Sequence, residues 1–435
     1  MPNGSASPDR AIHDALCRHD AVEVRRLLGA HPELRQRINE PLFAFNSPAI
    51  VAYADDAAMV SVLLEAGADP NRKSAWWAGP FHALYSATGE AADRLIAAGA
   101  VMDACAAAHL DRPGVLKKMI AADPARVHER GGDGQTPLHF AASKAVIDVL
   151  LEAGADINAR DVDHRSTPAE WMLKQRRGAG RYELAQHLAS RGAATDIFMA
   201  AALGLTDRAR ALLKENPALL DLRTGRGDYG EKPPSSYHIY FWTIGDGLTA
   251  LDVAMQFEQR DTLDAMLSVA SVKQRLLAAC RQGDETAAQD IVRAHKGILE
   301  SLTQDDQHVI ADAAWNGHAR AVQLMLDLGF DPRATGQDSG TALHLAAWEG
   351  SPETVAAILR HPDARTLVTI KDARHGGTPL GWCCHGSLNG NRSHDHAGVA
   401  RLLLAAGADR GDESQEASPA VLAVLRGGTT QQRDN

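Results

Sequence analysis

The sequence of 435 residues is poor in cysteine, in aromatic side chains and in long apolar runs. It has only five cysteines, and two of them are adjacent in the sequence. Because the number is odd and the spacing is irregular, we do not expect a disulfide framework. No apolar run approaches the roughly eighteen residues that a membrane-spanning helix needs. The opening residues, MPNGSASPDR, lack both the basic start and the apolar stretch of a secretory signal. We therefore expect a cytoplasmic protein that does not span a membrane.

Basic charge is also in deficit, with 45 Lys and Arg against 55 Asp and Glu and a formal net charge of −10. This balance disfavours nucleic acid and anionic membrane surfaces as partners, because binding to phosphates requires an excess of Lys and Arg. The short motifs of serine hydrolases, P-loop enzymes, zinc proteases, dinucleotide-binding enzymes and kinases are all missing. Whether the protein is an enzyme stays uncertain, leaning towards no, and we expect no cofactor.

Internal repetition is the main feature that the sequence does contain. The segment LLEAGADPN at 63–71 recurs as LLEAGADIN at 150–158. A second signature precedes several copies, as in DGQTPLHFAAS at 133–143 and SGTALHLAAWEG at 339–350. Repetition at such intervals is typical of folds in which similar units stack along a line.

The residue types of one copy predict a helix–turn–helix unit. Thr136 is suited to cap a helix that begins at Pro137, where the missing N–H of proline costs nothing. The small Ala141-Ala142 pair allows close helix packing, and Gly154 can end a second helix in the left-handed conformation. One such unit cannot bury its own apolar faces, so the units must stack.

These residues resemble the ankyrin repeat in the TPLH-type opening, the alanine pair and the LLxxGAD ending. The resemblance covers residues 9 to 426 and implies an all-α solenoid of about twelve helix–turn–helix units. We place the units at 9–39, 46–71, 79–103, 104–130, 134–158, 165–196, 197–223, 247–271, 272–302, 306–333, 339–370 and 377–410. The predicted division is a disordered N-terminus at 1–8, repeats at 9–223, an aromatic insertion at 224–246, repeats with a C-terminal cap at 247–426, and a disordered tail at 427–435.

An aromatic-rich finger insertion at 223–246 interrupts the repeat rhythm. It holds Tyr229, Tyr237, Tyr240, Phe241 and Trp242, although aromatics make up only 5% of the chain. Exposed aromatic surface is costly, so two interpretations stay open: the finger folds back on the stack, or it presents its aromatics to a ligand. The run IYFWTI is also compatible with a short β-hairpin arm.

A second aromatic group follows from the register of the repeats. The resemblance implies that the two residues after the alanine pair face the concave groove, where ankyrin repeats contact partners. Trp315 and Trp348 occupy such positions 33 residues apart, and His385 follows in the next unit. Either the tryptophans only help to hold the stack together, or they form a recognition stripe, since Trp dominates binding hot spots.

We predict a non-catalytic scaffold that binds a protein or peptide on an aromatic concave surface in the C-terminal half. The candidate binding residues are Trp315, Trp348, Glu349, His385, Tyr237, Tyr240, Trp242, Asp338 and His375. The alternative is an enzyme with a pocket between the 229–242 part of the finger and repeats ten to twelve, acting by acid/base chemistry on a small molecule. Its candidate groups are His385, His375, Asp338, Glu349 and Cys384.

The last repeat contains an insertion with His394 and His396, shortly after Cys383, Cys384 and His385. Thiolate and imidazole groups bind zinc, but two adjacent cysteines rarely ligate one ion. We expect a structural role for this segment and assign no metal ligand.

Overall fold

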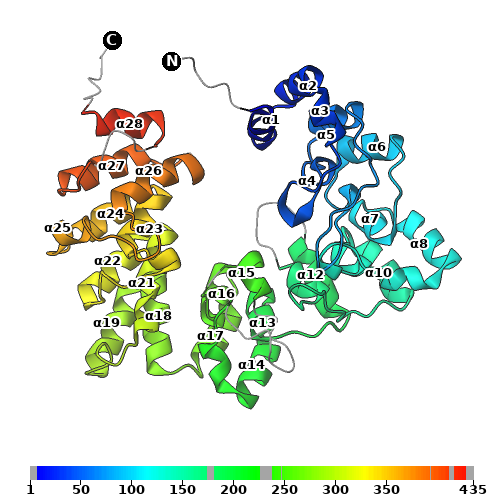
Figure 1. Ribbon diagram of the computed structural model, residues 1–435. Coiled ribbons are helices and arrows are strands. Elements are labelled where there is room, and N and C mark those ends of the chain that lie inside the picture. The colour runs from blue at the N-terminus through cyan, green and yellow to red at the C-terminus, as the bar shows by residue number, and fades with distance from the viewer. Residues whose placement is uncertain are drawn as a thin grey trace, which may run out of the picture. The chain divides into compact units, whose positions relative to one another are not determined.

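The computed structural model describes residues 7–173, 181–225, 238–245, 247–391, 393–410 and 416–427. Over these residues the regular structure is helical throughout, and the extended pairing is limited to two isolated bridges, Phe43 with Ser47 and Thr335 with Thr341. The predicted all-α class is thus confirmed. The chain forms two compact units, residues 1–265 and 266–435, and most of their helices are labelled in Figure 1.

The first unit is a succession of short helices in pairs, with 3₁₀ turns in several of the connecting loops. Its elements are α1 (Pro8–Cys17), α2 (Ala21–Ala30), α3 (Pro32–Gln36), η1 (Ala44–Asn46), α4 (Ala49–Ala52), α5 (Ala57–Glu65), η2 (Ala83–Tyr85), α6 (Gly89–Ala97), α7 (Ala104–His109), α8 (Pro113–Ala122), η3 (Pro124–His128), η4 (Gly132–Gly134), α9 (Pro137–Phe140), α10 (Lys144–Glu152), α11 (Pro168–Trp171), α12 (Arg181–Ser190), α13 (Ile197–Leu203), α14 (Thr206–Glu215), η5 (Pro217–Asp221), α15 (Ile239–Thr243), α16 (Ala250–Gln256) and α17 (Arg260–Leu267), whose last residues reach the second unit.

The second unit repeats the same plan with somewhat longer first helices. Its elements are α18 (Val272–Gln282), α19 (Glu285–Ala294), α20 (Gln304–Gln307), α21 (Val309–Trp315), α22 (Ala319–Leu328), η6 (Gln337–Ser339), α23 (Ala342–Glu349), α24 (Pro352–Leu359), α25 (Ala364–Leu367), α26 (Pro379–Asn389), α27 (His396–Ala405) and α28 (Pro419–Leu425).

The threonine of the repeated opening starts a helix and, through a histidine, links that helix to the next layer. His139 Nδ1 accepts the N–H of Thr136 at 3.1 Å, and its Nε2–H donates to the carbonyl oxygen of Ser166 at 3.0 Å. Burial lowers the pKa of His139 to about 3, so the ring is neutral and can accept and donate at once. His344 makes the equivalent bonds to the carbonyls of Ile370 and Gly377.

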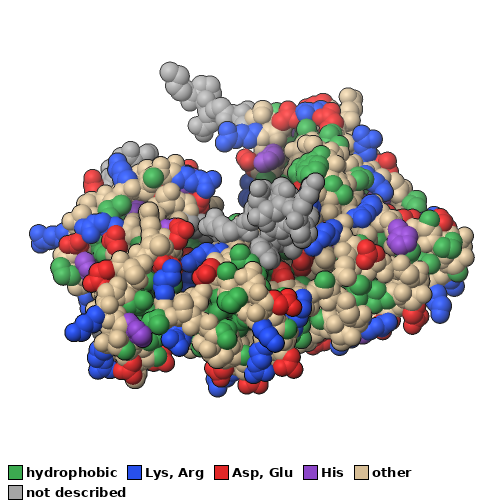
Figure 2. Space-filling view, turned by 90° about the horizontal axis from the view of Figure 1, so that it is seen from below, with side chains coloured by type: hydrophobic (Ala, Val, Ile, Leu, Met, Phe, Trp, Pro, Cys, Tyr) green, Lys and Arg blue, Asp and Glu red, His purple; other side chains and the backbone are tan. Residues whose placement is uncertain are grey.

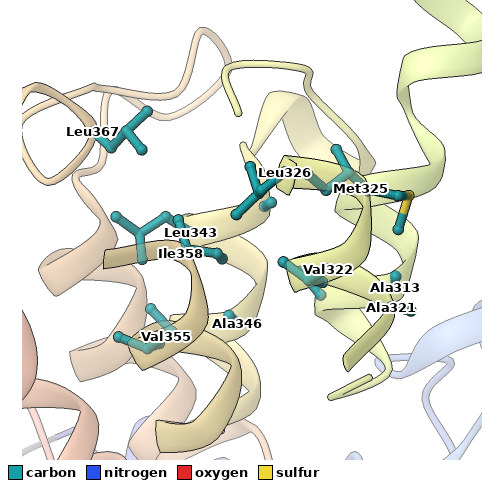
Figure 3. Packing of buried hydrophobic residues seen from close by; sticks show 14 of the residues in the cluster. Ala313, Ala321, Val322, Met325, Leu326, Leu343, Ala346, Val355, Ile358 and Leu367 are labelled. Carbon is teal, nitrogen blue, oxygen red and sulfur yellow. The ribbon is translucent and has the colours of Figure 1, made fainter. Parts of the chain in front are cut away.

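Apolar side chains between the helix layers form the core of the second unit. Figure 3 shows Leu343 and Ala346 of α23 with Val355 and Ile358 of α24, and all four are buried. The first helices α21, α23 and α26 pack side by side, as do the second helices α22 and α24. Because each layer buries its apolar face only against its neighbours, the stack satisfies the requirement that a single helix pair cannot meet.

Small residues set how closely neighbouring first helices approach. Cys383 and Cys384 take the place of the alanine pair in α26 and are fully buried. A Cβ on Gly386 would lie 2.3 Å from the carbonyl oxygen of Trp348, which leaves no room for any side chain at this position. The backbones of α23 and α26 therefore meet directly beside Trp348.

The described end of the finger is a short helix, α15, and the β-hairpin alternative was wrong. Ile239 and Tyr240 are both fully buried, and the Tyr240 hydroxyl donates to the carboxylate of Asp196 at 2.8 Å. The Tyr240 ring also lies edge-on to Phe198 at 5.4 Å. This part of the finger therefore folds back onto α13. Residues 226–237, with Tyr229 and Tyr237, lie outside the described residues.

Two glycines with different backbone conformations test the assigned helix ends. Gly154 has a φ of +90° and Gly29 lies within α2, and a Cβ added at either position would meet no atom within 4 Å. We expect Gly154→Ala to lower stability by about 1 kcal/mol, because it forces an L-residue into the left-handed region. Gly29→Ala should be neutral or stabilising, by up to about 1 kcal/mol, because it removes a helical glycine. Thermal unfolding followed by circular dichroism measures both, and equal effects would contradict the assignment.

The role of Tyr240 can be tested by comparing it with its exposed neighbour Trp242. Tyr240→Phe removes the hydroxyl that donates to Asp196, and we expect a loss of about 1 kcal/mol or more. Trp242→Ala should change stability by less than about 0.5 kcal/mol, because that side chain is 58% exposed. If thermal unfolding shows the larger effect at Trp242, the finger is not held in the way described.

Candidate functional site

Two tryptophans stand next to each other on one face of the second unit. Trp315 is the last residue of α21 and Trp348 lies near the end of α23. Their ring centroids are 6.5 Å apart and their planes differ by only 13°. Both side chains are partly exposed, so the pair has a core-facing side and a side that faces solvent.

A third tryptophan, Trp382 of α26, packs on the buried side of this pair and was not among the residues predicted from the sequence. It is 9% exposed and meets Trp348 edge-on at 6.2 Å. His385, one turn further along α26, is exposed and lies 5.1 Å from Trp348. We call Trp315, Trp348, Trp382 and His385 the aromatic wall. Trp382 follows the threonine of a Thr-Pro opening by four residues, at 378–382, and this spacing is the signal that could have revealed it.

A buried carboxylate holds Trp382 in place. Asp372 accepts hydrogen bonds from the indole N–H of Trp382 at 2.9 Å and from the backbone N–H groups of Arg374, His375 and Gly377. Burial raises the pKa of Asp372, but these donors outweigh it and lower the pKa to about 2. The carboxylate is therefore ionised at neutral pH and fixes the base of the aromatic wall.

The same arrangement recurs in the first unit. Asp161 accepts the backbone N–H of His164 at 2.7 Å and the indole N–H of Trp171. Both loops follow the pattern D-x-x-H-x-x-T-P-x-x-W, at 161–171 and at 372–382. We call this arrangement the Asp–Trp clasp.

The histidines of the last insertion bind the end of α23. His396 is buried and its Nε2–H donates to the carbonyl oxygen of Trp348 at 2.8 Å. His394 Nδ1 lies 2.6 Å from the carbonyl oxygen of Glu349 and 3.0 Å from its carboxylate. Burial raises the pKa of Glu349, while the two histidines lower it in part. Helix C-termini attract such donors, so the insertion stabilises the helix end that presents Trp348.

These contacts bear on the zinc alternative for the insertion. Within the described part of residues 383–396, the cysteines and histidines do not gather three ligand atoms around one point. Cys383 and Cys384 are buried, and burial raises the pKa of Cys384 to about 11, so its thiol is protonated at neutral pH. Cys384 is thus poorly suited to ligate a metal or to act as an acid/base group.

The remaining candidate residues take different positions. Asp338 forms an ion pair with Arg374, and the exposed His375 lies beside it on the neighbouring loop. Tyr240 and Trp242 belong to the first unit, where Tyr240 is buried and offers no exposed contact surface, contrary to its predicted role. Trp242 is exposed on the same unit. Tyr237 lies outside the described residues.

A further aromatic cluster in the first unit was not anticipated. The rings of Phe45 and Trp76 are 5.1 Å apart, as are those of Phe45 and Phe81, and Trp77 lies 5.9 Å from Trp76. Trp77 is 68% exposed. The Trp76-Trp77 pair in the sequence was a sufficient signal, but it lies in a connecting loop outside the repeated signatures.

On the face in Figure 2, acidic and basic side chains are mixed over both sides of the view. Among the described helices, none is both long enough and apolar enough to cross a bilayer.

The low pKa of Asp372 predicts a pH-dependent contribution to stability. A carboxylate with a folded pKa near 2 and an unfolded pKa near 4 stabilises above about pH 4 and loses this effect as the pH falls towards 2. We expect Asp372→Asn to destabilise by roughly 1 to 2 kcal/mol at pH 6, and the gap to the unsubstituted protein to shrink by pH 3. Urea unfolding at both pH values measures the gap, and a constant gap would show that Asp372 is not the strong acceptor described.

Comparison with known proteins agrees with the repeat architecture. The family of ankyrin repeats in three copies matches residues 276–370 and 310–414, and the single ankyrin repeat matches residues 133–162. The serine/threonine-protein kinase VIK of Arabidopsis thaliana is 39% identical over 88 residues, which is 20% of this chain and 19% of the kinase. The chain therefore spans about a fifth of the length of that relative. Ankyrin repeats generally mediate interactions between proteins, and the matches show that residues 133–162 and 276–414 of this chain contain such repeats.

Proposed function

We propose that the protein is a non-catalytic cytoplasmic scaffold that binds a protein or peptide segment on its aromatic wall. The observation that carries this proposal is the near-parallel pair of partly exposed tryptophans, Trp315 and Trp348, with the exposed His385 beside them. The ankyrin repeats of residues 276–414, which supply these side chains, belong to a family of interaction scaffolds.

The construction of the wall favours binding, because its side chains are fixed before any partner arrives. Trp382 is held by Asp372 and supports Trp348 from below. The end of α23 is held by His396 through the Trp348 carbonyl. Binding therefore costs the conformational entropy of the partner, but little additional side-chain entropy of the aromatic wall. Rigid indoles with one face in solvent are the side chains that dominate binding hot spots.

The charged groups around the wall indicate the chemistry of the partner. Glu349 follows Trp348 directly and Asp338 lies on the adjoining loop, although both have basic neighbours in His394 and Arg374. An indole face attracts cations as well as apolar groups. A segment with an apolar or an arginine side chain that covers the indoles therefore fits this wall better than an acidic segment does.

A peptide library displayed on phage and selected on the full chain provides the test. Peptides recovered from the selection should bind with at least ten-fold lower affinity to Trp348→Ala or Trp315→Ala, a loss of about 1.4 kcal/mol or more. Fluorescence anisotropy of the labelled peptides measures the affinity.

Trp77→Ala is the matched control, because it removes an exposed tryptophan from the first unit. It should leave the affinity of the same peptides unchanged. Circular dichroism of each variant separates a binding effect from loss of folding. Peptides that bind all three variants as well as the unsubstituted protein would reject the aromatic wall as the binding surface.

A further inference from the structure

A second cluster of polar side chains lies in the first unit, where the tips of two successive loops meet. Asp133 is at the tip of one loop, in η4, and Asp163 and His164 are at the tip of the next. One ligand atom from each of the three lies within 4.8 Å of the others. The backbone N–H of Val162 donates to the carbonyl oxygen of Asp133 at 2.9 Å and fixes the two tips against each other.

The second unit brings the corresponding two loop tips together through side chains of a different charge pattern. Asp338 has the same left-handed backbone as Asp133, with a φ of 51° against 56°, and each precedes a loop that carries an Asp–Trp clasp. Arg374 follows the clasp aspartate by two residues, as Asp163 does. In the second unit Arg374 and Asp338 form an ion pair. In the first unit the equivalent positions hold two carboxylates.

Among the described residues, the first unit lacks the positive charge that Arg374 provides in the second unit. Asp133 is only 8% exposed, so its charge is poorly solvated, and a second carboxylate nearby adds repulsion. In the second unit the guanidinium of Arg374 lies beside the equivalent aspartate, Asp338, and offsets its charge. In the first unit, among the described residues, Asp163 forms its ion pair with His164, and neither Asp163 nor Asp133 pairs with a Lys or Arg.

His164 supplies an independent sign of a ligand. Its Nδ1 atom is inaccessible to solvent and makes no hydrogen bond, although the side chain as a whole is 13% exposed. This atom lies 3.4 Å from the Asp163 carboxylate oxygen. Two ligands at about 2.1 Å from a tetrahedral zinc ion are separated by about 3.4 Å, so the spacing of this pair is compatible with binding one ion.

We propose that Asp133, Asp163 and His164 bind one divalent cation of the zinc class, which joins the two loop tips. One imidazole and two carboxylates are a donor set that Zn²⁺ accepts, whereas Mg²⁺ prefers oxygen ligands alone. The indole N–H of Trp76 donates to the Asp133 carboxylate at 2.9 Å and orients it, as outer hydrogen bonds orient metal ligands. A water molecule completes the four ligands of the ion.

Titration of the full chain with ZnCl₂ by isothermal calorimetry, after treatment with a chelator, tests this site. We expect one equivalent of zinc to bind, and thermal unfolding to shift upward when zinc is present. Binding should weaken at least ten-fold in His164→Gln. MgCl₂ should give no comparable binding.

Asp163→Arg is the most informative variant, because it recreates the charge pattern of Arg374 with Asp338. This variant should fold, should not bind zinc at this site, and should melt in chelator at a temperature equal to or above that of the unsubstituted protein. Cys17→Ser and His394→Gln serve as controls for zinc bound at the exposed Cys17 near His13 or at the last insertion, and both should retain the equivalent. Absence of saturable zinc binding, or binding that survives both Asp163→Arg and His164→Gln, overturns the proposal.

Discussion

The close approach of neighbouring first helices is the constraint on which the rest of the structure depends. A helix pair with one apolar side has to bury it against the next pair, and the pairs can meet only where side chains are small. Ala346 and Ala347 are fully buried at such a contact, and Gly386 has no space for a Cβ beside the Trp348 carbonyl. Because the backbones lie this close, larger side chains at the ends of the same helices are brought together. The pairing of Trp315 with Trp348 is thus a consequence of the close packing of the small residues that directly precede each tryptophan.

The sequence was sufficient to predict the helical repeat, because its signals are local. Thr136 with Pro137 begins a helix and Gly154 ends one, and both effects depend on the backbone of a few residues. The 33-residue interval between Trp315 and Trp348 likewise became a spatial contact through regular stacking. Features that join distant parts of the chain were harder to predict. Tyr240 is buried against Phe198 and its hydroxyl donates to Asp196, 44 residues earlier, and no local pattern indicates that bond.

The insertion with His394 and His396 illustrates the same limit. Its residue types are those of a metal site, yet the rings contact the carbonyl oxygens of Trp348 and Glu349, which a helix end leaves without partners. The chemistry of a histidine depends on what faces it, and composition alone cannot distinguish an ion from a helix C-terminus. Conversely, His164 has the same place in its loop as His375 has in the second unit, and the sequence does not show that its Nδ1 atom is buried without a hydrogen bond.

The Asp–Trp clasp shows how one loop design serves different purposes within a single chain. In both copies an aspartate collects the N–H groups of its own loop and an indole N–H, so the loop has a fixed shape whatever residues occupy its tip. The tip is then free to vary in charge, and it holds Arg374 in one copy and Asp163 in the other. In a stack where each layer contacts only its neighbours, such a change at one tip is not transmitted to remote layers. A charged loop tip in the first unit and an aromatic wall in the second can therefore diverge independently, because the same buried hydrogen bonds maintain the fold beneath both.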